Sequence, residues 1–290
     1  MPLAVTVDIG ATADPPPTLQ AIEGRVAAFW KAGTGADTVG YHYCFAKDGG
    51  FPGAWAPGTP GLAGRTTDGT TATDAGCVPI VNAATGGNYL TQFELAGTVA
   101  HFFTLFDVLW VNSGAVVTTT TGQTVNSGTL PARDLNGTTN GEGCWIGLLF
   151  TAAATNAAVI SNATVTYTNS AGTGSRTATL ANLVGAQIPA TPTIGTIVWF
   201  QLAAGDTGVR SIQTLTLGTS LVTGSVSLLI ARPLATYSAA AANIGAGPYR
   251  PMDPGIRLYN GTCALIAYQA SATTATTITG SIVVQERILA

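Results

Sequence analysis

Residues 161–180 read SNATVTYTNSAGTGSRTATL, and this stretch decides the fold class. Ala163, Val165 and Tyr167 alternate with threonines, and this period of two predicts a half-exposed β-strand. Asparagine, serine and glycines over 169–174 tolerate the positive φ angles of a turn, after which the alternation resumes. We therefore expect a β-hairpin whose outward face presents hydroxyl and methyl groups in place of charges. Such a face is suited to contact with another protein.

The same pattern recurs beyond residue 115. Runs such as CWIGLLFTA, TIVWFQLAA and SVSLLIARPL are short and apolar, and turns rich in Gly, Asn, Asp and Ser separate them. Many short strands without helical periodicity between them are typical of an antiparallel β-sandwich or jelly roll. We therefore expect a mainly β protein in which residues 115–290 form a sandwich or jelly-roll domain.

Residues 1–114 are predicted to form an N-terminal extension with one or two short helices and long loops. The segment TLQAIEGRVAAFWKAG (18–33) begins with a threonine that can cap a helix and ends with a glycine that can stop one. The apolar stripe of this predicted helix would dock on its own domain or on a neighbouring subunit or particle, and it comprises Leu19, Ile22, Val26, Phe29 and Trp30.

Two further segments of the extension carry expectations. A second short helix is predicted over 97–110 from apolar residues at helical spacing, with a strand as the alternative. Between the two predicted helices, the density of Pro and Gly over 41–89 indicates long loops, and loops of this length tend to be functional.

The composition describes an unusually neutral surface. Only 9% of the 290 residues are charged, against about 25% in an ordinary domain, and the mean hydropathy is +0.35. A net charge of −3 without any basic cluster argues against nucleic acid as a partner. The longest apolar candidate, 194–204, is too short for a membrane span and contains a glutamine, so no membrane partner is expected either. Since the start has no basic segment before an apolar one, we expect synthesis in the cytoplasm.

The four cysteines and two histidines give no strong sign of chemistry. The cysteines are scattered and form no CxxC motif, so buried thiols are favoured, and a bridge between Cys44 and Cys77 or between subunits is the alternative. His42 and Cys44 would share one face of a strand, which suits a metal or thiolate–imidazole pair, but no further ligands are evident. His101 lies among phenylalanines and is predicted to be a core or interface residue. We therefore expect no metal and no other cofactor.

The acidic residues likewise suggest turns more than catalysis. Asp48, Asp68 and Asp74 lie in glycine-rich loops without the spacing of a calcium loop, so they are interpreted as turn residues. No two carboxylates form a defensible pair for sugar hydrolysis. We therefore name no catalytic residue, and an envelope-degrading tail enzyme is the weakest of the functions considered.

Trp55 supports a different alternative. It lies in the loop GAWAPG, whereas Trp110, Trp145 and Trp199 lie mostly inside apolar runs that favour core packing. An exposed tryptophan can stack on a sugar ring, so the alternative function is a carbohydrate- or receptor-binding β-sandwich module like those of tail fibres and adhesins, with Trp55 as its platform.

Three segments resemble virion structural proteins of tailed bacteriophages: residues 105–148, ATVTYTNSAGTGSRTATL, and residues 201–235. The phrases LFDxLW, TYTNSAG, AGDTGVRS and RPLA carry the resemblance, which covers roughly the last two thirds of the chain. It implies a non-enzymatic virion component, often with a jelly-roll fold, and transfers no catalytic residue. Together with the neutral surface it predicts a homo-oligomer, a trimer or higher, that decorates the head or forms part of the neck or tail. Its expected partners are copies of itself and other virion proteins such as the capsid, portal or neck, and tail.

Overall fold

The structure is a computed structural model that describes residues 20–33, 37–239, 255–274 and 276–288. Within these ranges the regular elements are antiparallel β-strands and two 3-10 turns, η1 (Phe45–Lys47) and η2 (Ala72–Asp74), with no α-helix. The predicted mainly β class is therefore confirmed.

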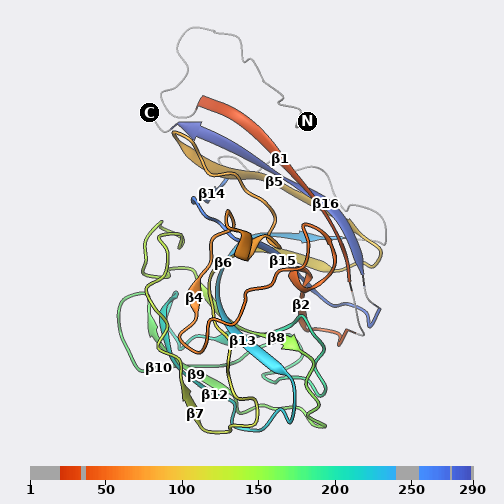
Figure 1. The fold of residues 1–290 in the computed structure, drawn as a ribbon, viewed down its shortest axis with the longest axis vertical. Coiled ribbons are helices and arrows are strands. Elements are labelled where there is room, and N and C mark those ends of the chain that lie inside the picture. The colour runs from red at the N-terminus through yellow and green to blue at the C-terminus, as the bar shows by residue number, and fades with distance from the viewer. Residues whose placement is uncertain (1–19, 34–36, 240–254, 275, 289–290) are drawn as a thin grey trace.

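The smaller sheet has five strands in the order β14-β5-β16-β1-β3. Figure 1 shows it at one end of the molecule, where strands from the beginning and the end of the chain lie side by side. Its strands are β1 (Gln20–Ala32), β3 (Gly50–Phe51), β5 (Gly87–Gly97), β14 (Ile256–Leu258) and β16 (Thr277–Ile288).

The larger sheet has eleven strands in the order β2-β15-β6-β13-β8-β11-β10-β9-β12-β7, with β4 paired to β6. Its strands are β2 (His42–Cys44), β4 (Arg65–Thr66), β6 (Phe102–Val111), β7 (Gly122–Thr124), β8 (Trp145–Ala152), β9 (Thr164–Asn169), β10 (Arg176–Leu180), β11 (Thr196–Gln201), β12 (Val209–Thr216), β13 (Ser225–Ser238) and β15 (Ala264–Gln269).

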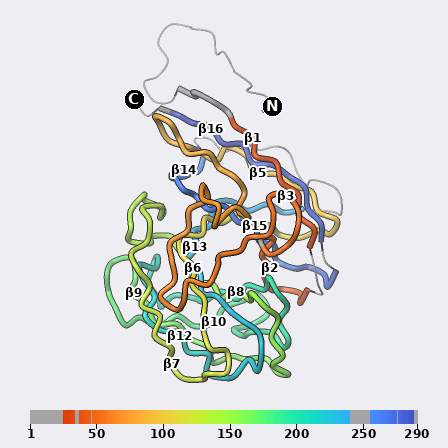
Figure 2. Tube along the Cα trace, in the orientation of Figure 1, coloured from red at the N-terminus to blue at the C-terminus, as the bar shows by residue number. Residues whose placement is uncertain are grey.

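Part of this sheet closes on itself. Because β2 pairs with β11 as well as with β15, the strands β2, β15, β6, β13, β8 and β11 form a six-stranded barrel. Alternate positions on all six strands supply a hydrophobic cluster separate from the rest of the core, including Phe106, Leu149, Trp199, Leu229 and Leu265. Figure 2 shows the barrel between the five-stranded sheet and the extension formed by β10, β9, β12 and β7.

The helix predicted over 18–33 is wrong, because this segment is the strand β1. It pairs along its whole length with β16, from Gln20 opposite Ile288 to Ala32 opposite Thr277. Phe29 and Lys31 face inward and are buried, whereas Val26 and Trp30 on the other face are exposed. This burial has a period of two, and the small alanines between the large residues conceal it in the sequence.

The helix predicted over 97–110 is also wrong, and the alternative of a strand is correct. β6 lies between β13 and β15 in the barrel, so almost every residue in it is buried whichever face it occupies. A central strand covered on both faces has no polar alternation, and periodicity alone cannot distinguish it from a buried helix.

The inner face of the five-stranded sheet packs against the barrel. Phe29, Leu90 and Ile282 are buried there, and the ring of Phe93 meets Tyr237 of β13 edge-on at 6.2 Å. Strands from both sides of residue 114 contribute to each sheet, so the boundary expected there does not coincide with a boundary between the sheets.

Candidate functional site

The outer face of the five-stranded sheet exposes three large apolar side chains. Val26, Trp30 and Phe51 are 69%, 51% and 54% exposed. The register places Trp30 beside Phe51 and Val26 beside Val283, so these side chains share one face. We call the set Val26, Ala28, Trp30, Phe51 and Val283 the outer apolar face.

Strand β1, which carries Val26 and Trp30, also has an open edge. β3 pairs only with Trp30 and Lys31, so the Gln20–Phe29 part of β1 has no partner strand on that side among the described residues. An unpaired edge offers backbone N–H and C=O groups to another chain, and proteins usually protect such edges with lysine, proline or a bulge.

The predicted assembly stripe divides between two faces. Val26 and Trp30 are on the exposed face, whereas Phe29 points into the core and is 2% exposed. Leu19 lies outside the described residues, and so does the side chain of Ile22.

A second surface lies at the opposite end of the molecule and carries hydroxyl groups. The hairpin of β9 and β10 forms as predicted, with Val165, Tyr167 and Ala178 buried and the threonines turned outward. The register then continues these threonines across four strands, in a row that runs Thr177, Thr166, Thr214 and Thr124. We call the outward side of β10, β9, β12 and β7 the hydroxyl face.

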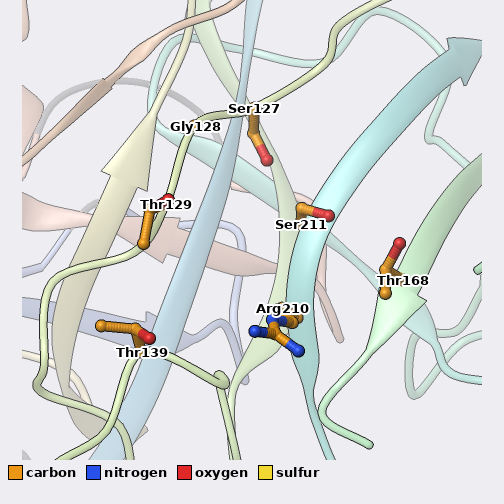
Figure 3. Close-up of a pocket in the computed structure, with 7 residues that line it drawn as sticks. All are labelled: Ser127, Gly128, Thr129, Thr139, Thr168, Arg210 and Ser211. Carbon is orange, nitrogen blue, oxygen red and sulfur yellow. The ribbon is translucent and has the colours of Figure 1, made fainter. Parts of the chain in front are cut away.

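A pocket of about 350 Å³ opens at one end of the hydroxyl face. Figure 3 shows that Thr168 and Ser211 lie on neighbouring strands, that Ser127 and Thr139 come from loops, and that Arg210 lies among them. The full lining is Ser127, Gly128, Thr129, Thr139, Thr168, Arg210 and Ser211.

A β-bulge places Arg210 in this pocket. In the pairing of β12 with β9, Val209 lies opposite Asn169 and Ser211 opposite Thr168, so Arg210 is the extra residue. Consecutive residues of a regular strand point to opposite faces, but here Arg210 and Ser211 both line the pocket. A bulge re-aims side chains in this way and is common beside functional sites.

Arg210 has no countercharge among the described residues. Arg25, Arg65, Arg133 and Arg176 each lie within 4.0 Å of a carboxylate, whereas no ion pair or hydrogen bond joins Arg210 to any described group. Its guanidinium is exposed, and its Nη1 lies near Gly172 in the hairpin turn. The pocket therefore offers a fork of N–H donors to an anion.

The pocket hydroxyls retain hydrogen-bonding capacity. The hydroxyl groups of Thr129, Thr139 and Thr168 make no hydrogen bond to described residues. Ser127 Oγ accepts the backbone N–H of Ile212 at 2.8 Å, so its own hydrogen can still be donated.

Trp55 is not a sugar platform, because it is 1% exposed. Its indole Nε1 donates to Asp74 Oδ1 at 2.7 Å, and Arg65 binds both oxygens of the same carboxylate at 2.7 and 2.9 Å. These hydrogen bonds and the Arg65 charge hold the pKa of Asp74 below its usual value against the effect of burial. Hydrogen bonds among Trp55, Arg65 and Asp74 therefore stabilise the irregular segment before β5.

The prediction of four unbridged thiols is wrong for Cys77, and the alternative of a bridge between Cys44 and Cys77 is wrong as well. Cys77 forms a disulfide with Cys263, whose Cα lies 5.6 Å from its own. Cys44 is on β2 in the same hydrophobic cluster as the two bridged cysteines, and Cys144 is buried beside Glu142. The pairing joins the loop after η2 to the start of β15, two segments that the sequence gives no reason to place together.

The two histidines are packed in the interior. The ring of His42 meets Trp199 edge-on at 6.1 Å, and His101 lies 4.9 Å from the ring of Tyr268. Burial lowers the pKa of each to about 4, so both are neutral at pH 7. Within the described ranges no three His, Cys, Asp or Glu side chains lie close enough to hold a metal, and no helix is long and apolar enough to cross a membrane.

Comparisons with protein families, with curated proteins and with solved structures find no match to this chain. The two surfaces must therefore be interpreted from their own geometry. Sequence reasoning missed the Arg210 pocket, although one signal was present: the run VRSIQTLTL (209–217) has Arg210 as its only charged residue among hydroxyl and apolar residues and one glutamine.

Proposed function

We propose that this chain is a non-enzymatic structural protein of a tailed-bacteriophage virion. In this proposal it is a homo-oligomer, a trimer or higher, that decorates the head or forms part of the neck or tail. Its partners are copies of itself and neighbouring virion proteins such as the capsid, portal or neck, and tail.

The observation that carries the proposal is the outer apolar face beside an open strand edge. Val26, Trp30 and Phe51 would bury apolar area on association, at about 25 cal/mol per Å² removed from water. The edge of β1 can pair with a strand of a second subunit, which would extend the sheet.

The low charge of the chain supports the same conclusion. A subunit that contacts many copies of itself must desolvate its surface, and an ion that loses water without full compensation costs several kcal/mol. A chain with 9% charged residues avoids most of this cost. The resemblance of residues 105–148 and 201–235 to phage structural proteins indicates that the particle in which such contacts would form is a phage virion.

The sandwich or jelly-roll arrangement that is common among such components belongs to this proposal as well. Both the antiparallel sheets and the six-stranded barrel are compatible with a shell-associated β domain. An experimental structure of the assembled particle would decide the arrangement of the subunits.

Mass spectrometry of separated heads and tails from purified particles is the direct test. Many copies on heads would make the chain a shell or decoration protein, and a few copies with tails would make it a neck or tail part. Absence from both would overturn the proposal.

A matched pair of variants tests the surface. We expect the purified chain to be a trimer or higher by light scattering, and Val26→Thr/Trp30→Thr to shift it towards monomer. Threonine suits a strand, so β1 should still form. The control Val116→Thr/Leu183→Thr removes similarly exposed apolar side chains elsewhere and should leave the oligomer intact. A monomeric wild type at high concentration would contradict the proposed assembly.

A further inference from the structure

The Arg210 pocket combines one guanidinium with a wall of hydroxyl groups. Five of its seven lining residues are serine or threonine, and the volume of about 350 Å³ is at the lower end of the range for small-ligand sites. A ligand that satisfies this pocket needs one acidic group and several hydroxyls that both donate and accept hydrogen bonds.

The single cation selects the acidic group. A guanidinium binds a planar carboxylate through two parallel N–H···O bonds, and Arg210 has no described partner with which the ligand would compete. Phosphate sites usually add a helix N-terminus, a nest of backbone N–H groups or several cations. The pocket lining contains no second basic side chain.

The hydroxyls select the rest of the ligand. The hydroxyl groups of Thr129, Thr139 and Thr168 have no described hydrogen-bond partners. Thr129 and Thr139 belong to the segment between β7 and β8, and Thr168 belongs to β9, so two separate parts of the chain bring hydroxyls to Arg210. Sugar rings present hydroxyls in several directions and can exchange hydrogen bonds with such a wall. The threonine methyl groups give the ring carbons a modest apolar contact.

We propose that the pocket around Arg210 binds a saccharide that carries a carboxylate. The carboxylate pairs with the Arg210 guanidinium, while ring hydroxyls bond to Ser127, Thr139 and Thr168. This inference does not depend on the outer apolar face or on assembly, because the pocket lies wholly within one chain, at the end of the molecule opposite that face.

Binding of a panel of sugars to the full chain tests the proposal. The probes are glucuronate, galacturonate and mannuronate, their neutral parents glucose, galactose and mannose, and acetate and inorganic phosphate alone. Calorimetry or saturation-transfer NMR should show at least one acidic sugar binding about tenfold or more tighter than its neutral parent and than acetate, as expected for an added charge-assisted hydrogen-bond pair.

Variants locate the site. Arg210→Gln should remove the preference for the acidic sugar, and Arg210→Lys should restore part of it, because lysine keeps the charge but loses the fork. Thr168→Val, which keeps the shape of the side chain, should weaken binding severalfold. Arg25→Gln removes the same charge from the other sheet and should bind like the wild type.

Three outcomes overturn the inference. The first is that no acidic sugar in the panel binds more tightly than its neutral parent. The second is that phosphate or acetate alone binds as tightly as the best acidic sugar, which would make the pocket a general anion site. The third is that Arg210→Gln, shown by its melting curve to be folded, retains the wild-type preference.

Discussion

Phe29 of β1 packs over Gly280 of β16, the residue directly opposite it in the register. A Cβ atom at position 280 would lie 2.7 Å from Phe29 Cζ and 2.6 Å from Leu95 Cβ. Glycine at this position therefore allows the three central strands of the small sheet to approach closely, with the aromatic ring covering the exposed backbone.

Gly280→Ala should destabilise the protein by about 1–3 kcal/mol, because the added methyl group would also clash with the carbonyl oxygen of Glu94, which is backbone and cannot turn away. Urea denaturation measures the change. Gly122→Ala is the control, since its added Cβ would meet only Thr216 Oγ1 at 3.5 Å. Equal stability of the two variants would show that position 280 is not tightly packed.

The sequence predicted the parts of the fold that depend on neighbouring residues. The hairpin of β9 and β10 forms from alternation and turn residues within one stretch of 20 residues, and a sequence pattern detects both. β1 could not be found in this way, because its strand conformation depends on β16 at the other end of the chain, with Trp30 opposite Thr279. Its apolar residues also fit a helical stripe, and only the long-range pairing decides between the two.

The candidate sites depend even more on long-range structure. Trp55 was expected to be exposed because it lies in a loop of Pro and Gly, yet Asp74 and Arg65 hold it inside. The role of Arg210 could not be predicted, because a bulge, which no residue pattern reveals, turns it towards the hydroxyls of β9 and of the segment between β7 and β8. The sequence did predict that the hydroxyl face carries hydroxyl groups in place of charges, because the alternation of threonines is visible within a single strand.

Arg133→Met should destabilise the protein by about 3–5 kcal/mol, because it breaks the ion pair of the buried Asp107 and leaves that carboxylate with the weaker attraction of Arg232. Arg133 Nε lies 3.2 Å from Asp107 Oδ2, and its two Nη groups donate to the carbonyls of Thr67 and Val108 at 2.8 and 2.9 Å. Chemical denaturation measures the loss.

The control for the buried pair is Arg176→Met. Arg176 lies 2.9 Å from Asp206 in a similar ion pair, but it is partly exposed, so water can replace the lost contact and the change should be much smaller. If the two variants lose similar stability, burial does not determine the contribution of the Asp107 pair.

Stability should fall as the pH is lowered from 6.5 towards 4, in part because of His101. The folded protein holds its ring neutral with a pKa of about 4, with Nδ1 accepting the backbone N–H of Ser271 at 3.0 Å, whereas the unfolded chain takes up a proton near pH 6.5. The contribution of His101 to the free energy of unfolding is therefore fully present above pH 6.5. On the order of 3 kcal/mol of it is lost as the pH falls from 6.5 through the folded pKa.

The variant His101→Gln isolates this contribution. Because the pKa of His42 is also about 4, His42 lowers the stability of the protein over the same pH range. Burial raises the pKa of Asp37 to about 6, so protonation of Asp37 raises the stability of the protein over a similar range. Both are present in wild type and variant, so the difference between their stability–pH curves reports on His101. Denaturation at half-unit pH steps should give a shallower decline for His101→Gln, and parallel curves would contradict the low pKa.

Cys263→Ala should lower the stability of the oxidised protein by about 2–5 kcal/mol, because the bridge to Cys77 closes a loop with a sequence separation of 186 residues and restricts the unfolded chain. Urea denaturation with and without a reductant measures this, and reductant should bring the wild type close to the variant. Cys144→Ala removes a buried cysteine outside the bridge, and its stability should respond to reductant as the wild type does.

A protein made in a reducing cytoplasm would close this bridge only after release, so its stability should rise on oxidation. If reductant leaves the wild-type midpoint unchanged, the bridge does not contribute to stability and the oxidation step has no structural role.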